Sequence, residues 1–122
     1  ILIGTPFMPN LTDAIFFAED IGEEPYRVDR LLSHLANAGI LENLAGLIFG
    51  QFTNATPKNI PSLEMEEVFR QYTERMKKNS PAMSGLSYGH IKHKHTLPIG
   101  AKAQLSVAAG QCELEILESV VS

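Results

Sequence analysis

Glu19 and His90 are two side chains of this sequence whose types could move a proton. Glu19 directly follows the apolar run Ala14 to Ala18, and ligand-handling groups gather at the carboxyl ends of strands in open α/β sheets. A carboxylate there can orient an imidazole, which takes a proton from a hydroxyl and returns it to a leaving amine. Gly89, before His90, allows a close backbone approach or a conformation closed to other residues.

Both residues also have plain structural interpretations. Five acids stand around the start of a predicted helix: Glu19, Asp20, Glu23, Glu24 and Asp29. One of them would ordinarily cap that helix while the others face water. A lone histidine is more often structural than catalytic. Residue types and positions alone therefore leave both roles open.

A serine motif lies just before His90. Gly85-Leu86-Ser87-Tyr88-Gly89 satisfies the G-x-S-x-G pattern of hydrolase nucleophiles, which requires the serine on a sharp turn between a strand and a helix. The residues after Gly89 alternate and are interrupted by Pro98, with no helical period. We therefore reject Ser87 as a nucleophile and expect it in a strand or turn.

His90, His93 and His95 are close enough in sequence to suggest a metal site. In an extended segment, however, His93 and His95 would share one face while His90 lay on the other. Lys92 and Lys94 would also repel a cation. We predict no metal site, and we expect His93 and His95 to be solvated, where their charges could help hold an acidic substrate.

The first half of the chain reads as strand, helix, strand. Residues 14–18 predict a strand buried on both faces, which Glu19 and Asp20 end. Pro25 suits the first turn of a helix that Gly39 would stop. Residues 44–52 predict a second buried strand, so the crossover favours parallel pairing.

The second half predicts one more helix and then antiparallel strands. Ser62 is a candidate cap for a helix with the apolar face Met65, Val68, Phe69, Tyr72 and Met76. Residues 81–85 are turn-rich, and a strand is expected through Leu86 and Tyr88. Hairpins should follow from Thr96, with residues 98–100 between strands, a turn at Gly110-Gln111, and Leu114 and Ile116 facing away from Glu113 and Glu115.

Composition limits the class of protein. The 122 residues are 44% hydrophobic, enough for the core of one domain. The apolar runs are far shorter than the roughly 20 residues of a membrane span, and we expect neither a membrane span nor a targeting leader. The net charge of −4 and scattered basic residues argue against a nucleic-acid partner. A single cysteine, Cys112, fits a reducing compartment.

Two segments carry a family resemblance. Residues 15–32 contain Phe-Phe-Ala-Glu-Asp-Ile-Gly-Glu and, at Tyr26 to Arg30, Tyr-x-x-Asp-Arg; residues 89–100 begin Gly-His and end Leu-Pro-Ile-Gly. Both resemble the serine LD-carboxypeptidases and their relatives that cleave microcin-type conjugates. Ala18 stands where the family more often carries a larger apolar residue. The resemblance covers essentially the whole chain.

The resemblance implies that residues 1–122 are the C-terminal domain of such an enzyme, without the N-terminal domain that bears the serine. It implies an α/β fold of the swivelling β/β/α type, with a parallel central sheet and a smaller antiparallel sheet. Glu19 and His90 would be the catalytic glutamate and histidine, acting without a metal or other cofactor. The sequence begins at Ile1, inside an apolar stretch, which also suggests that it is a piece of a longer protein.

By the same resemblance, the reaction would release terminal D-alanine from cytoplasmic murein tetrapeptides, or cleave a peptide–nucleotide conjugate. A non-catalytic binding module and a histidine metal-binding domain stay open as other classes. The partners expected are the N-terminal domain, a muropeptide or related peptide and, for the isolated chain, a second copy in a dimer. Membranes and nucleic acids are not expected.

Three geometric expectations follow. Glu19 and His90 should have side-chain atoms within roughly 5 Å, because catalytic hydrogen bonds are often looser without substrate. Both should lie at the rim of an exposed inter-domain surface, with Ile1-Leu2-Ile3 near the same junction. Arg27 and Arg30 could together bind a carboxylate, although we expect them to pair with neighbouring acids.

Overall fold

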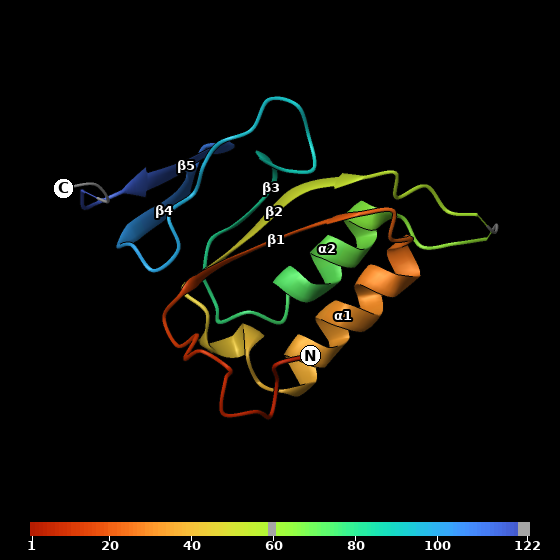
Figure 1. The fold of residues 1–122 in the computed structure, drawn as a ribbon, viewed down its shortest axis with the longest axis horizontal. Helices are drawn as coiled ribbons and strands as arrows, with labels where there is room; N and C mark the ends of the chain where they lie inside the picture. Colours follow the sequence, from red (N-terminus) through yellow and green to blue (C-terminus); the bar gives the residue numbers. More distant parts are fainter. Residues whose placement is uncertain (59–60, 120–122) are drawn as a thin grey trace.

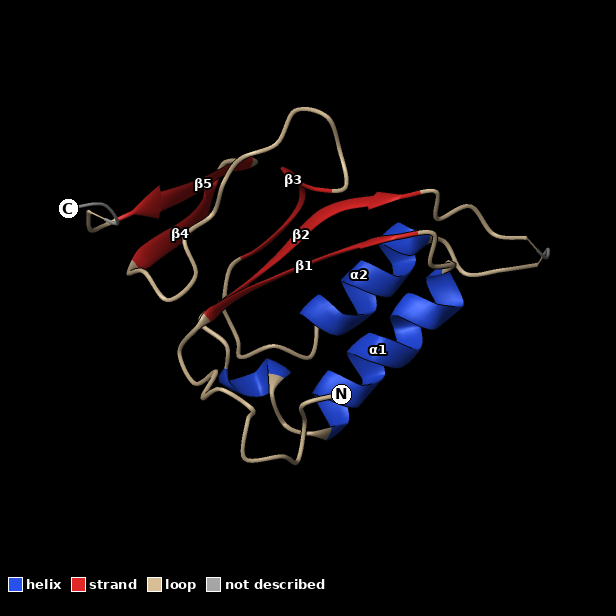
Figure 2. Cartoon of the chain, in the orientation of Figure 1, coloured by secondary structure: helices blue, strands red, loops and turns tan. Residues whose placement is uncertain are grey.

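A computed structural model describes residues 1–58 and 61–119. Within them, a parallel sheet has the strand order β1-β2-β3, and a separate antiparallel hairpin pairs β4 with β5. The strands are β1 (Ile15–Ile21), β2 (Gly46–Thr53), β3 (Ala82–Gly89), β4 (Ala103–Ala108) and β5 (Gln111–Ile116); the helices are α1 (Pro25–Asn37), α2 (Met65–Thr73) and a short 3₁₀ turn, Leu41–Asn43. Figure 1 and Figure 2 show α1 and α2 side by side against one face of the sheet. The α/β class with a parallel and a smaller antiparallel sheet is confirmed.

β1 differs from its prediction in length and burial. It continues past Ala18 to Ile21, so Glu19 and Asp20 lie within the strand. Its residues are half-buried apart from the exposed Ile21. β1 is an edge strand of the described sheet, and β2 takes the central place. The expectation of burial on both faces is therefore wrong for β1, whereas Leu47, Ile48 and Phe49 of β2 meet it at 0–1% exposure.

α1 begins and ends where the sequence predicts. Pro25 occupies its first turn, and Gly39 follows its end with φ +69°. The N-cap is Glu24, but its side chain makes no capping hydrogen bond. Its carboxylate instead accepts a hydrogen bond from the backbone N–H of Lys58, at 2.9 Å. An acid therefore occupies the N-cap position as expected, but its side chain does not cap the helix, because the loop after β2 binds that carboxylate.

α2 starts later than predicted. Its N-cap is Glu64 rather than Ser62, whose hydroxyl lies 3.4 Å from the carbonyl oxygen of Leu63. The predicted apolar face is nevertheless correct, since Val68, Tyr72 and Met76 are all buried against α1 and β2. The core between the sheet and the helices comprises Val28, Leu32, Leu41, Leu44, Leu47, Phe49, Val68, Tyr72 and Met76.

β3 occupies residues that the sequence assigned to a turn. It begins at Ala82, whose register partner on β2 is Leu47. Gly85 has φ +82°, yet it lies inside the strand at an irregularity in the β2–β3 pairing. The turn signal over residues 81–85 therefore marks a local break within a strand, not a connection between elements.

The hairpin agrees with its prediction apart from small shifts. Leu105 faces Leu114, and the turn falls at Ala109-Gly110, one residue earlier than expected. Among the described residues no strand lies between Gly89 and Ala103. Residues 98–100 therefore lie between strands, but in the long connection from β3 to β4 and not in a hairpin turn after Thr96. A Cβ on Gly46 would lie 2.9 Å from Leu105 Cδ2, so the hairpin packs against the start of β2.

The α1–α2 interface contains a polar contact with a measurable effect on stability. The hydroxyl of Tyr72, a residue 2% exposed, donates to Asp29 Oδ1 at 2.8 Å and lies 3.0 Å from the Asp29 carbonyl oxygen. Burial raises the pKa of Tyr72 above its ordinary value, and the Asp29 bond raises it further.

Tyr72→Phe should lower the free energy of unfolding by about 1–2 kcal/mol, because it leaves part of the Asp29 polar surface unpaired. Urea unfolding measures this change. Tyr26→Phe, at an exposed position, is the control and should change stability by less than about 0.5 kcal/mol. Equal stability of the two variants would contradict the prediction.

Candidate active site

Glu19 and His90 meet in the folded domain although 71 residues separate them. His90 Nδ1 lies 2.8 Å from Glu19 Oε2. The distance is that of a charge-assisted hydrogen bond and is well inside the expected limit. The predicted approach of the two side chains is confirmed, while their catalytic role stays a prediction.

Two glycines make room for the Glu19 side chain. Gly89 has φ +120°, and a Cβ there would lie 2.8 Å from Glu19 Oε2. A Cβ on Gly50 would lie 2.7 Å from the Tyr88 carbonyl oxygen and 3.2 Å from Glu19 Cβ. Both uses foreseen for Gly89, close approach and unusual backbone, are confirmed. Gly50 was missed, although an isolated glycine within a strand pattern signals a close approach.

The two side chains differ in exposure. The Glu19 side chain is 19% exposed and the His90 side chain is 57% exposed. Glu19 is thus held among other atoms while His90 presents its ring to solvent. Such a half-exposed pair contributes only about 0–1 kcal/mol to stability. Its geometry is consequently not explained by a need to hold the fold together.

This arrangement suits proton transfer. When Nδ1 carries the proton and donates it to the Glu19 carboxylate, Nε2 of His90 is left as an acceptor. An accessible Nε2 can take a proton from an incoming hydroxyl, and the carboxylate stabilises the imidazolium that forms. The pair therefore has the geometry that a histidine and a carboxylate need in a nucleophile-activating relay.

Ser87 lies on β3, as the sequence predicts for a strand residue. Its side chain is exposed, and its carbonyl oxygen accepts a hydrogen bond from the backbone N–H of His95 at 2.7 Å. The chain after Gly89 bends and runs without a helix to β4. Ser87 therefore lacks the strand–turn–helix elbow that its motif requires.

The histidine segment is bent rather than extended. Residues 90–93 form a bend, so the alternation used to separate the three histidines does not hold there. His93 and His95 are exposed as expected, and so are Lys92 and Lys94. In residues 1–58 and 61–119, no group of three or more His, Cys, Asp and Glu side chains is placed to hold a metal ion.

Arg27 pairs with a nearby acid, as expected. Its Nη1 lies 3.3 Å from Glu23 Oε2, and its Nε donates to the Tyr26 hydroxyl at 3.1 Å. The Tyr26 hydrogen bond, followed by Glu23, raises the pKa of Arg27. Arg30 is exposed on the same helix. The interpretation of Arg27 as a partner of the neighbouring acids is confirmed.

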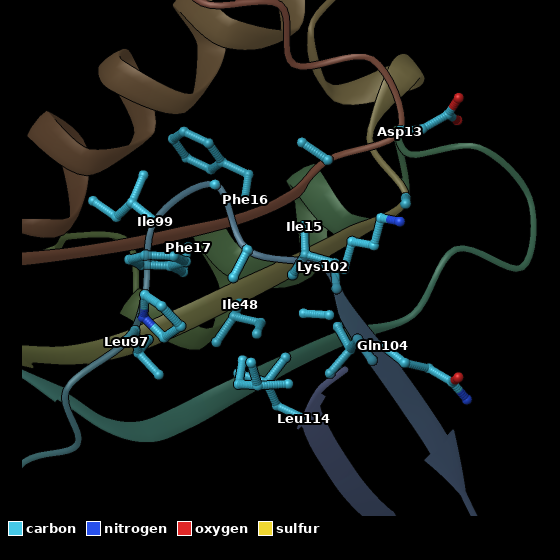
Figure 3. A pocket seen from close by; sticks show the side chains of 18 of the residues that line it. Asp13, Ile15, Phe16, Phe17, Ile48, Leu97, Ile99, Lys102, Gln104 and Leu114 are labelled. Carbon is cyan, nitrogen blue, oxygen red and sulfur yellow. The ribbon is translucent and has the colours of Figure 1, made fainter. Parts of the chain in front are cut away.

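An apolar hollow of about 920 Å³ lies between the sheet and the hairpin. Figure 3 shows Phe17 and Ile48 of the sheet together with Leu97 and Leu114 around it. Glu19 and His90 are outside its lining. Phe17, however, lies two residues before Glu19 and makes an edge contact with Tyr88, with ring centroids 5.0 Å apart. β1 therefore contributes to both features, with Phe17 in the lining of the hollow and Glu19 in the acid–base pair.

The opening residues lie elsewhere. Ile1 and Leu2 are exposed, as expected. Figure 1, however, places the N-terminus far from the segment that follows β3 and carries His90. Residues 1–14 pass around the end of the sheet at which β1 starts. The placement of residues 1–3 at the inter-domain junction stays a prediction.

Comparisons with known proteins agree on one family. Residues 1–105 match the family described as "LD-carboxypeptidase C-terminal domain". The chain is 37% identical over 114 residues to the "Probable murein peptide carboxypeptidase" of Bacillus subtilis, covering 93% of this chain and 35% of that protein. It resembles the crystal structure of muramoyltetrapeptide carboxypeptidase from Oxalobacter formigenes with a TM-score of 0.83 and 36% identity, covering 94% of this chain and 40% of that one. The chain thus spans little more than a third of the length of these relatives.

Proposed function

Because the chain belongs to the family of LD-carboxypeptidase C-terminal domains, we propose that it supplies the Glu19–His90 half of a serine peptidase. The enzyme would hydrolyse the amide between an L-centre and a terminal D-alanine of a murein tetrapeptide. The observation that carries this proposal is the 2.8 Å contact between Glu19 and His90. The names of the relatives, a murein peptide carboxypeptidase and a muramoyltetrapeptide carboxypeptidase, indicate the substrate class.

The nucleophile would come from a second domain. A serine hydroxyl placed beside His90 Nε2 would give its proton to the imidazole while its oxygen attacks the scissile carbonyl carbon. Collapse of the tetrahedral intermediate would break the C–N bond and pass the proton to the departing D-alanine amine. Water, activated by the same imidazole, would then hydrolyse the acyl-serine and restore the enzyme.

Glu19 would orient His90 rather than react itself. The Glu19 side chain passes Gly50 at its Cβ and Gly89 at its Oε2, and its carboxylate would keep the proton on Nδ1 and stabilise the imidazolium. Unlike an exposed glutamate, a partly enclosed carboxylate loses little rotational freedom when it binds the ring. The greater burial of Glu19 than of His90 fits this division of roles.

The N-terminal domain would approach the exposed side of His90. The 57% exposure of that side chain leaves a path for a serine from outside the chain. The apolar hollow beside Phe17 would supply the apolar part of an inter-domain contact, and such contacts commonly combine apolar and polar surface. A dimer of the isolated chain stays a prediction.

We place the reaction in the cytoplasm. Cys112 is a free and exposed thiol, which suits a reducing compartment. No helix in the part of the chain that the structure describes has the length and apolar character needed to cross a membrane.

The full-length enzyme, with its N-terminal domain, should release D-alanine from an L-D tetrapeptide, while the 122-residue chain alone should release none. Removing the nucleophile leaves only the residual rate supplied by binding and the oxyanion hole. Ser87→Ala in the full-length enzyme should keep kcat within about twofold, since Ser87 lies on a strand and not on an elbow. Amino-acid analysis of the released D-alanine measures the activity of the full-length enzyme, the 122-residue chain and the Ser87→Ala variant.

Two results would contradict the proposal. A full-length enzyme that cleaves no L-D bond would remove the assigned reaction. D-Alanine release by the 122-residue chain, abolished by Ser87→Ala, would instead make Ser87 the nucleophile.

A further inference from the structure

The three strands of the parallel sheet lose their regular pairing at the level of the candidate site. Between β1 and β2, Glu19 alone faces two residues, Gly50 and Gln51. Between β2 and β3, Gly50 alone faces residues 85–88, because Phe49 pairs with Ser84 and Gln51 pairs with Gly89. Such bulges re-aim side chains and are frequent beside active sites.

The extra residues of β3 determine where His90 lies. Residues 85–88 have no register partner on β2, and pairing resumes at Gly89, immediately before His90. A shorter or flatter bulge would move Gly89 along the sheet and carry the imidazole away from Glu19. The 2.8 Å contact therefore depends on the shape of this bulge.

One side chain binds the bulge from across the sheet. Gln51 Nε2 donates to the carbonyl oxygen of Gly85 at 2.9 Å and lies 3.3 Å from that of Leu86. Both carbonyls belong to the stretch that the β2–β3 ladder skips. Gln51 is only partly exposed, and its backbone is the register partner of Gly89. The same residue thus contacts the start and the end of the bulge.

We infer that Gln51 is a positioning residue for His90. Its amide fixes the path of residues 85–88, which in turn sets the orientation of His90 toward Glu19. Gln51 need not touch substrate for this role. The inference rests on the proposed function for its kinetic consequence, but the arrangement of the imidazole and carboxylate can be tested without any reaction.

Gln51→Leu, which keeps the bulk of the side chain and removes its donors, should lower kcat of the full-length enzyme about 10–100-fold and change KM less than about threefold. A misplacement on the order of 1 Å at a reacting group can cost about a hundredfold. Imidazole ¹⁵N chemical shifts of His90, assigned with a His90→Gln sample, should show the proton redistributed from Nδ1 to both ring nitrogens. This tautomer readout would not respond to a loss of global stability alone.

Gln71→Leu is the matched control, because Gln71 is an exposed glutamine on α2. It should keep kcat within about twofold and leave the His90 shifts unchanged. If Gln51→Leu does not fold, Gln51→Asn is the second variant. Its amide is one methylene too short to reach both carbonyls, so the same losses are expected.

A Gln51 variant that leaves the His90 shifts unchanged would overturn the inference, whether or not kcat falls. If the unmodified enzyme releases no D-alanine, the proposed function fails separately, and the ¹⁵N shifts still decide the role of Gln51. If a Gln51 variant changes the His90 tautomer and lowers kcat while KM stays steady, the result supports both the proposed function and the positioning role of Gln51.

Discussion

Replacing His90 with alanine in the full-length enzyme should lower kcat for D-alanine release by about 10⁴-fold or more, the size of loss seen when a member of a hydrolytic triad is removed. In the proposed mechanism His90 accepts the nucleophile's proton at Nε2, because Glu19 engages its Nδ1. Steady-state kinetics on an L-D tetrapeptide measures the loss.

The fold should tolerate this change. The His90 side chain is 57% exposed, and a pair of this exposure adds little to stability. Thermal unfolding should therefore shift by no more than a few degrees. His93→Ala is the matched control, because His93 is exposed on the same bent segment; it should keep kcat within about twofold. A loss below tenfold for His90→Ala would remove His90 from the mechanism.

The sequence correctly predicted those features of helices and strands that depend on residues within or next to the same element. Pro25 in the first turn of α1 and Gly39 after its end act through their own backbone preferences, so the sequence was sufficient there. The apolar face of α2 follows from a spacing within one helix, and its buried residues agree. Alternation likewise placed Leu105 and Leu114 on a hairpin.

Predictions failed where a distant partner decides the outcome. The Glu24 carboxylate accepts a hydrogen bond from the backbone N–H of Lys58 instead of capping α1, and no pattern within α1 indicates that contact. β1 is half-buried because β2, not β1, occupies the centre of the described sheet. Composition of a single strand cannot distinguish those two places.

The candidate site was likewise predictable only in part from the sequence. Residue types and strand ends made Glu19 and His90 candidates, but only the family resemblance singled them out from five acids and four histidines. Their approach depends on bulges in two ladders, which involve Gly50, Gln51 and Gly85. A glycine inside a strand pattern signals a bulge, but its depth and direction are set by pairing with other strands.

Gly89→Ala should disable the site by moving Glu19. The new methyl group would lie 2.8 Å from Glu19 Oε2 and 3.1 Å from the Gln51 carbonyl oxygen, at a residue with φ +120°. The backbone oxygen gives way less readily than the carboxylate, so the carboxylate should leave His90. We expect kcat of the full-length enzyme to fall about a hundredfold or more, similar to Glu19→Gln in the same assay.

The unusual backbone of Gly89 also costs stability, on the order of 1–3 kcal/mol for alanine, and that cost must be separated from the loss of the carboxylate. Gly110→Ala provides the separation, since Gly110 has φ +78° in the β4–β5 turn and no heavy atom lies within 4 Å of an added Cβ. It should lose comparable stability in urea unfolding while keeping kcat within about twofold. If Gly89→Ala also kept kcat within that range, the 2.8 Å contact between Glu19 and His90 would not be required for the reaction, and Glu19 would be a structural acid.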